Sequence, residues 1–261
     1  MDGARHSMLA RLKGEIDRLE SGTAETLRRV PLGHAEADAV LQGGLVQGAL
    51  HEVFCDGAQA PAATGFAAGV ARLLADQRFL LWIRQDFSAR ENGELAMEGL
   101  AELGLDPRRI VMVSAHDADS ALRAAADALA CNALGAVITE LWGDTRAFDQ
   151  VASRKLTLAA QDSGVTALML RIAAAPQAST AETRWMVRAA HSPPSEDWGA
   201  PVLDTSLIRN RHGQTGRWIM EWNCDACQFR EPQTHSRLVA AEVADRSVRT
   251  SVTSAGQRLA G

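Results

Sequence analysis

The sequence predicts an α/β domain whose core is a mostly parallel, twisted sheet with helices on both faces and an antiparallel extension at one edge. Three observations predict this class. The chain has 261 residues, of which 46% are hydrophobic and 23% charged, so it can bury a large core. Short apolar runs of strand length alternate with stretches of helical periodicity. Most connections are long enough to hold a helix, which parallel neighbouring strands require.

The first predicted element is an amphipathic helix over residues 7–21, where apolar residues recur at helical spacing between charged ones. This helix and a short linker form an N-terminal region, 1–29, ahead of a core that we expect to span 30–230. The apolar stripe is narrow, so it either caps its own domain or binds a partner protein. Its partner-binding candidates are Leu9, Leu12, Ile16 and Leu19.

The core is predicted to alternate strands and helices after a short helix over 35–41. Its first strand, 49–54, leads through a glycine-bearing loop into a helix over 64–76. The further strands are predicted at 79–83, 110–113, 135–140 and 166–172. The further helices are predicted at 91–103, 119–131 and 146–162. Apolar strands separated by helices indicate a parallel sheet covered on both faces.

The end of the chain has a different pattern. Residues 183–190, 202–209 and 216–222 alternate, and their connections are too short for helices, which predicts antiparallel strands at the sheet edge. From Glu231 the residues are small and polar with weak periodicity. We therefore expect 231–261 to be a flexible tail or a docking segment.

The segment "GAQAPAAT", Gly57 to Thr64, overlays the phosphate-binding pattern G-x-x-x-x-G-K-[ST] without a gap. It follows a predicted strand and precedes a predicted helix, which is the setting that such a loop requires. Gly57 and Thr64 fit, but Ala62 and Ala63 stand where the second glycine and the lysine belong, and Pro61 removes an N–H donor. The sequence thus predicts a degenerate phosphate loop, with binding of ATP and magnesium lost or weak.

Several phrases resemble the RecA core and, more closely, the ImuA family, when taken in their order and spacing. They include "LQGGLVQGALHEVF", "LGAVITEL", "SRKLTLAAQDSGVTALMLR" and "IRNRHGQTGRWIMEW". ImuA proteins are RecA-like accessory proteins encoded beside a Y-family-like polymerase homologue and an error-prone C-family polymerase in bacterial damage-inducible operons. The resemblance covers most of the chain, from about residue 31 to residue 222.

The resemblance implies a cytoplasmic, non-catalytic adaptor in SOS-induced translesion DNA synthesis. The partners it implies are the Y-family-like polymerase homologue and the error-prone C-family DNA polymerase, with RecA as a further candidate. It also places Glu140 where RecA-like folds carry an acid at a strand end, and Asp86 where a water-activating carboxylate is expected. Without the loop lysine we expect no catalytic residue. The alternative is a weak, DNA-stimulated ATPase that relies on Asp86 or Glu140.

Direct binding of DNA is a second alternative, in the form of a single-strand-binding regulator of RecA filaments. The net charge of −5 and the pI near 5.8 argue against it. The segments that correspond to the DNA-binding loops of RecA are short, and the local positive charges are Arg146, Arg171 and Arg184. Strong binding of strands is therefore not expected.

The remaining features predict no further site. Cys224 and Cys227 form a C-x-x-C pair with only His235 nearby, short of the four ligands of structural zinc, so we expect no metal. Trp198, in a proline-rich loop, is either an exposed binding anchor or packs on the sheet. No signal peptide and no apolar run long enough for a membrane span is present, which predicts a soluble protein.

Overall fold

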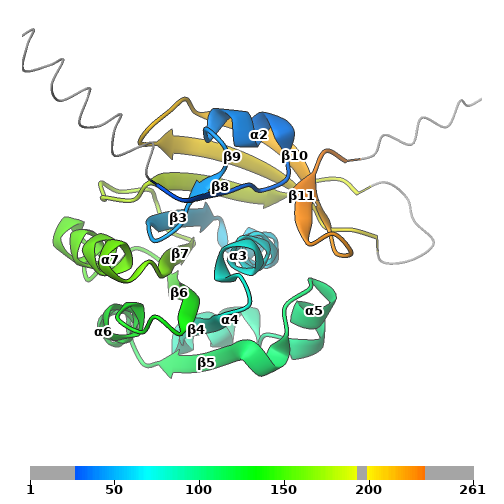
Figure 1. Ribbon diagram of the computed structural model, residues 1–261. Coiled ribbons are helices and arrows are strands. Elements are labelled where there is room, and N and C mark those ends of the chain that lie inside the picture. The colour runs from blue at the N-terminus through cyan, green and yellow to red at the C-terminus, as the bar shows by residue number, and fades with distance from the viewer. Residues whose placement is uncertain (1–26, 193–198, 233–261) are drawn as a thin grey trace, which may run out of the picture.

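A computed structural model of the chain describes residues 27–192 and 199–232. The predicted N-terminal helix with its four partner-binding candidates, Trp198, and the tail from residue 233 lie outside the described residues. Within them, the backbone forms a nine-stranded central sheet and a separate two-stranded sheet (Figure 1).

Six strands of the central sheet run parallel, in the order β8-β3-β7-β6-β4-β5. Their bounds are β3 (Leu50–Cys55), β4 (Phe79–Gln85), β5 (Ile110–Ala115), β6 (Leu134–Trp142), β7 (Thr166–Ile172) and β8 (Thr183–Ala189). β3, β6 and β7 are buried almost throughout, as expected for strands that helices cover on both sides. The four further core strands predicted from the apolar runs are confirmed.

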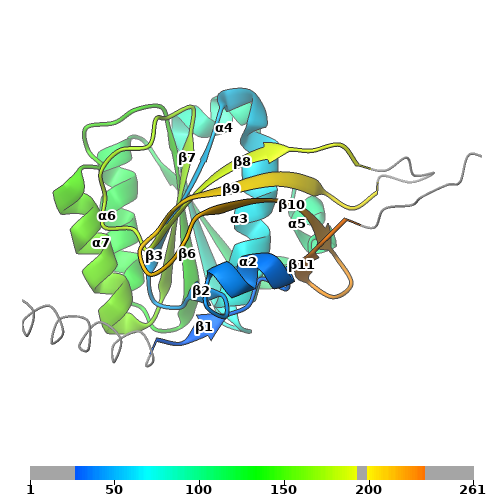
Figure 2. The ribbon, with the colours of Figure 1, turned by 90° about the horizontal axis from the view of Figure 1, so that it is seen from above.

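The antiparallel extension is also confirmed, except that the predicted strand 183–190 is β8, which pairs in parallel with β3 and is antiparallel only to its other neighbour. It continues the sheet beyond β8 with β9 (Val202–Asn210), β10 (Gly216–Asn223) and β11 (Gln228–Arg230), each antiparallel to its neighbour. The separate sheet pairs β1 (Arg29–Val30) with β2 (Leu45–Val46), on either side of the short helix α2 (Ala35–Val40). This sheet lies where the chain enters the core (Figure 2).

Helices cover both faces of the sheet, as Figure 1 shows. α3 (Ala60–Ala75) and α5 (Met97–Glu102) lie on one face, and α6 (Ala118–Leu129) and α7 (Gln150–Ser163) lie on the other. Each face has its own apolar cluster, the first built around α3 and the second around α6 and α7. The RecA-like α/β fold expected from the sequence is therefore confirmed. None of the described helices is both long and apolar enough to cross a membrane.

Two predicted helices have different bounds in the structure. The helix predicted over 91–103 is replaced by the end of α4 (Asp86–Asn92) and the separate short helix α5, because Gly93 takes φ +75° and ends α4. The helix predicted from residue 146 begins at Gln150, because the Asp149 carboxylate accepts the N–H of Ala152 at 2.8 Å and caps it.

Strand β3 holds a buried histidine near its amino end. His51 Nε2 donates to the carbonyl of Val46 at 2.8 Å, and Nδ1 accepts from the Thr183 hydroxyl at 2.7 Å. The indole N–H of Trp185 donates to the same hydroxyl oxygen at 3.0 Å. Burial lowers the pKa of His51 to about 4, so the ring is neutral at pH 7.

The carboxyl end of α3 packs directly on the start of β6. A Cβ atom added at Gly135 would lie 2.3 Å from the carbonyl oxygen of Ala75, which is backbone and cannot move aside cheaply. This close approach of helix to sheet therefore requires a residue without a side chain at position 135.

Candidate nucleotide site at the carboxyl edge of the sheet

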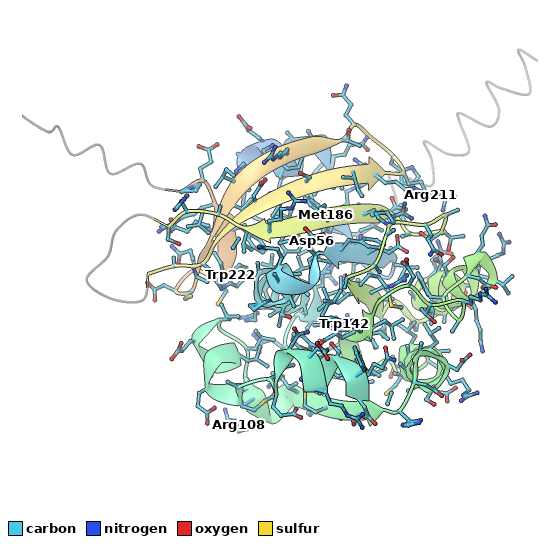
Figure 3. The ribbon with its side chains drawn as sticks, turned by 180° about the vertical axis from the view of Figure 1, so that it is seen from behind. Asp56, Arg108, Trp142, Met186, Arg211 and Trp222 are labelled. Atoms are coloured by element: carbon cyan, nitrogen blue, oxygen red, sulfur yellow. The ribbon has the colours of Figure 1, made fainter. Side chains whose placement is uncertain are left out.

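The carboxyl ends of the parallel strands meet at one edge of the sheet, where open α/β sheets bind their ligands. The predicted site residues all follow or end these strands: Gly57 follows β3, Asp86 follows β4, and Glu140 lies near the end of β6. Figure 3 labels Asp56 and Trp142 on this side of the molecule, next to the amino end of α3. This edge is the candidate site.

The predicted phosphate loop is helical instead of open. Gly57–Gln59 forms a 3-10 turn, and α3 begins at Ala60, so the predicted helix start at Thr64 is wrong by four residues. Pro61 fits the first helical turn, where its missing N–H has no intrahelical partner to lose, and the alanines are strong helix formers. Ala63 is fully buried in the core cluster. The segment therefore lacks the wide loop that would surround phosphate groups.

An aromatic side chain covers the glycine that fits the motif. A Cβ atom at Gly57 would lie 3.3 Å from the outer ring edge of Trp142. The indole of Trp142 packs edge-on against the ring of Phe87, with the ring centroids 5.9 Å apart. The backbone N–H of Trp142 donates to the Gln85 side-chain oxygen at 3.2 Å, which fixes the end of β6 to the end of β4. The indole ring of Trp142 thus occupies the space next to Gly57.

Glu140 is held in a buried ion pair. Its carboxylate accepts from Arg84 at 3.0 and 3.2 Å, from the indole N–H of Trp82 at 3.2 Å, and from the hydroxyl of Ser88. Glu140 is 1% exposed and Arg84 5% exposed. A carboxylate with this many donors and a paired guanidinium has little capacity left for a magnesium ion or a water.

Asp86 begins α4 and is turned toward the edge strand β5. Its carboxylate accepts from the hydroxyl of Ser114 and lies 3.7 Å from His116 Nδ1. Asp86 follows β4, which is three strands from β3 in the sheet, or about 14 Å away at the usual spacing of about 4.8 Å between strands. The structure therefore does not bring Asp86 together with Gly57.

The charge of this edge also disfavours phosphate. Asp56 directly precedes Gly57, Asp86 follows β4, and Asp144 lies just beyond Trp142. Asp56 has one partly exposed partner, Arg188, at 3.5 Å. Lys155 is exposed on α7, so it does not replace the missing lysine of the motif.

Two of the three arginines considered for DNA contact lie inside the protein. Arg171 is 1% exposed, and its guanidinium lies 5.7 Å from the ring centroid of Phe54 and 5.1 Å from that of Phe148. Burial lowers the pKa of Arg171. Arg184 donates to Glu52 at 2.7 Å. Of the three, only Arg146 is exposed to an outside ligand.

The C-x-x-C pair lies in the turn between β10 and β11. The thiol of Cys227 donates to the carbonyl oxygen of Cys224 at 3.3 Å, and burial raises the pKa of Cys224. In the part of the chain that the structure describes, no three His, Cys, Asp or Glu side chains are grouped so as to hold a metal ion.

Sequence reasoning missed the side chains that close this edge. Arg84 and Phe87 were not singled out, and Trp142 was expected only to pack at the end of the sheet. An available signal was an aromatic residue close to each of two strand ends: Phe87 lies two residues after the end of β4, and Trp142 is the last residue of β6. Comparison with known proteins adds no relative: no protein-family model matches the chain, and no curated protein matches it.

Proposed function

We propose that the protein is a non-catalytic, RecA-like accessory protein that links other proteins in damage-induced translesion DNA synthesis. The fold supports the RecA-like part of this proposal. The role and the partners rest on the resemblance to the ImuA family: a Y-family-like polymerase homologue, the error-prone C-family polymerase and, as a further candidate, RecA.

One observation carries the non-catalytic part: the indole of Trp142 packs on Gly57 at the place where phosphate would enter. A working loop needs free N–H groups and a lysine around the phosphates. Here the segment is helical, the lysine position is a buried alanine, and Glu140 is neutralised by Arg84. Losing charge-assisted contacts of this kind costs several kcal/mol, or about a thousandfold in affinity at about 1.4 kcal/mol per factor of ten.

Titration calorimetry with ATP and magnesium tests the non-catalytic part. We expect no heat of binding at micromolar concentrations and no phosphate release in the presence of single-stranded DNA. Micromolar affinity for ATP would overturn this expectation, and hydrolysis that disappears in Asp86→Asn would in addition support the weak ATPase. Arg123→Ala, at an exposed position on α6, is the matched control for that variant.

Co-purification tests the adaptor part. The tagged full chain is co-expressed with the Y-family-like homologue, and Leu12→Asp combined with Ile16→Asp is compared with Ile219→Asp. Ile219 is an exposed apolar residue on β10, so it controls for the mere introduction of charge. We expect the paired N-terminal substitutions to remove the partner from the eluate and the control to retain it. If the wild-type chain captures no partner, the adaptor role is wrong.

A further inference from the structure

A pocket of about 170 Å³ lies at the opposite edge of the sheet from the candidate nucleotide site. It is formed where the carboxyl end of α3 meets the amino ends of β4 and β5, beside the 3-10 turn η2 (Pro107–Arg109). Figure 3 labels Arg108 of this turn well apart from Asp56 and Trp142. The two sites therefore share no residue.

The pocket has an apolar floor and a cationic rim. The floor consists of the buried side chains of Ala71, Ala75, Leu80 and Leu105. The rim carries three arginines and one aspartate: Arg72, Arg78, Arg109 and Asp106. Three positive charges against one negative leave the lining with a net charge of +2.

Two of the three rim arginines keep donors without a partner among the described residues, whereas Arg109 donates to the carbonyl oxygen of Gln77. Arg72 uses only Nε, which donates to the carbonyl of Gly104 at 2.8 Å, and this bond holds the side chain over the floor. Among the described residues the Arg78 side chain makes no hydrogen bond and no ion pair. The terminal nitrogens of two guanidinium groups are thus available to an acceptor.

The rim aspartate is already paired, chiefly with an arginine that lies outside the pocket lining. Asp106 accepts from Arg108 at 3.0 and 3.2 Å through both of its oxygens, and Arg109 lies 3.7 Å away. Arg108 does not line the pocket. Asp106 is therefore not free to satisfy Arg72 and Arg78, and their charge is left for a ligand.

We propose that this pocket binds a carboxylate joined to a short apolar group, about one amino-acid residue in size. A guanidinium fork matches the two oxygens of a carboxylate. The apolar floor offers nothing to a bare inorganic anion but takes a branched aliphatic group. Ligand pockets for drug-sized molecules have volumes of roughly 300–1,000 Å³, so this one is too small for a nucleotide.

Two sources supply this chemistry: the carboxyl-terminal residue of a polypeptide and a free short-chain carboxylic acid. The proposal is independent of the adaptor role, since it rests only on the pocket. Its test is an NMR titration of the ¹⁵N-labelled full chain at constant ionic strength. The probes are isovalerate, an acetylated Gly-Ser-Gly-Leu peptide with a free carboxyl terminus, the same peptide amidated, and inorganic phosphate.

We expect the free-acid peptide or isovalerate to shift the backbone amide signals of Gly104 and Leu105, and the amidated peptide to leave them in place. Arg78→Ala should weaken that binding at least tenfold, while Arg123→Ala should leave it unchanged. A tighter complex with the peptide identifies a polypeptide terminus as the source, and a tighter complex with isovalerate identifies a free acid.

Three results would overturn the proposal: no shift with either acid at millimolar concentration, equal binding of the acid and amide peptides, or phosphate binding at least as tight as that of the acids. The comparison of acid with amide uses the wild-type chain, so it stands even if Arg78→Ala fails to fold. Far-UV circular dichroism checks the folding of each variant.

Discussion

The two edges of the parallel sheet differ in what fills them. At the carboxyl edge, where this class of sheet binds ligands, Trp142 and Phe87 occupy the space beside Gly57 and Arg84 neutralises Glu140. At the amino edge, three arginines are among the residues that line a pocket with an apolar floor. The same fold can therefore close its usual site with packed side chains while the opposite edge stays available for binding.

The largest effect on stability is expected from breaking the buried ion pair of Arg84 and Glu140 at the carboxyl edge. Arg84→Met leaves the carboxylate of Glu140 buried without its cation, and we expect the free energy of unfolding to fall by about 3–5 kcal/mol. Urea denaturation measures it. Glu140→Gln, which keeps an acceptor for Trp82 and Ser88 and removes the charge, should cost less. A loss below about 1 kcal/mol for Arg84→Met would mean that water reaches the pair.

The pH dependence of stability tests the buried, neutral state of His51 on β3, a strand that connects the two edges. The pKa of His51 is about 4 in the folded chain and about 6.5 when unfolded, so between these values the unfolded state binds the extra proton. Stability is therefore lost as the pH falls from 6.5 to 4, by up to about 3 kcal/mol at about 1.4 kcal/mol per pKa unit.

His51→Gln does not titrate, so its unfolding free energy should vary less with pH over that range than that of the wild-type chain. The difference between the two urea series isolates the contribution of this one ring from that of the carboxylates. If the unfolding free energies of both proteins change equally with pH, His51 takes up its proton at the same pH in the folded and the unfolded chain.

A smaller effect is expected from uncovering Gly57. Trp142 is half-buried, so Trp142→Ala should lower the free energy of unfolding by about 2 kcal/mol, less than the 3–5 kcal/mol typical of fully buried aromatic residues. We expect no measurable affinity for ATP in calorimetry, because Ala63 and its helix remain in place. A gain of ATP binding would show that the aromatic cover alone closes the edge.

The smallest effect is expected at an exposed ion pair in the antiparallel extension. Arg217 on β10 donates to Asp204 on β9 at 2.7 Å, with the arginine side chain 69% exposed. Arg217→Met should leave the midpoint of urea denaturation almost unchanged, and raising the salt concentration should shrink any difference from the wild-type chain. If the free energy of unfolding fell as much as in Arg84→Met, solvent exposure would not explain why the two ion pairs are expected to differ in strength.

Most of the fold could be predicted because its signals are local. The apolar runs that became β4 and β7, and the alternating run that became β9, each carry their own period in the sequence. The start of α3 was predicted four residues too late because Pro61 was interpreted as a loop residue, although proline also fits the first turn of a helix. The alanines on both sides of Pro61 favour the helix, because alanine is the strongest helix former.

The candidate site was harder to predict because its chemistry depends on distant contacts. Glu140 was correctly placed near the end of a strand, but its partner Arg84 lies 56 residues earlier and meets it only because β4 and β6 are neighbours. The cover over Gly57 comes from Trp142, on another strand. The arginine-lined pocket likewise joins "ADQRF" with "DPRRI", segments that no spacing rule connects.

The tight fit at Gly135 bears on how relatives of this chain are to be recognised. The residues that overlay the phosphate motif form a 3-10 turn and the first turn of α3, so a search that requires the intact motif would miss this chain. The carbonyl oxygen of Ala75 permits no side chain at position 135, whatever the protein binds. A search for chains with this packing can therefore require a glycine at the second position of the strand that carries Glu140, whether or not the phosphate motif is intact.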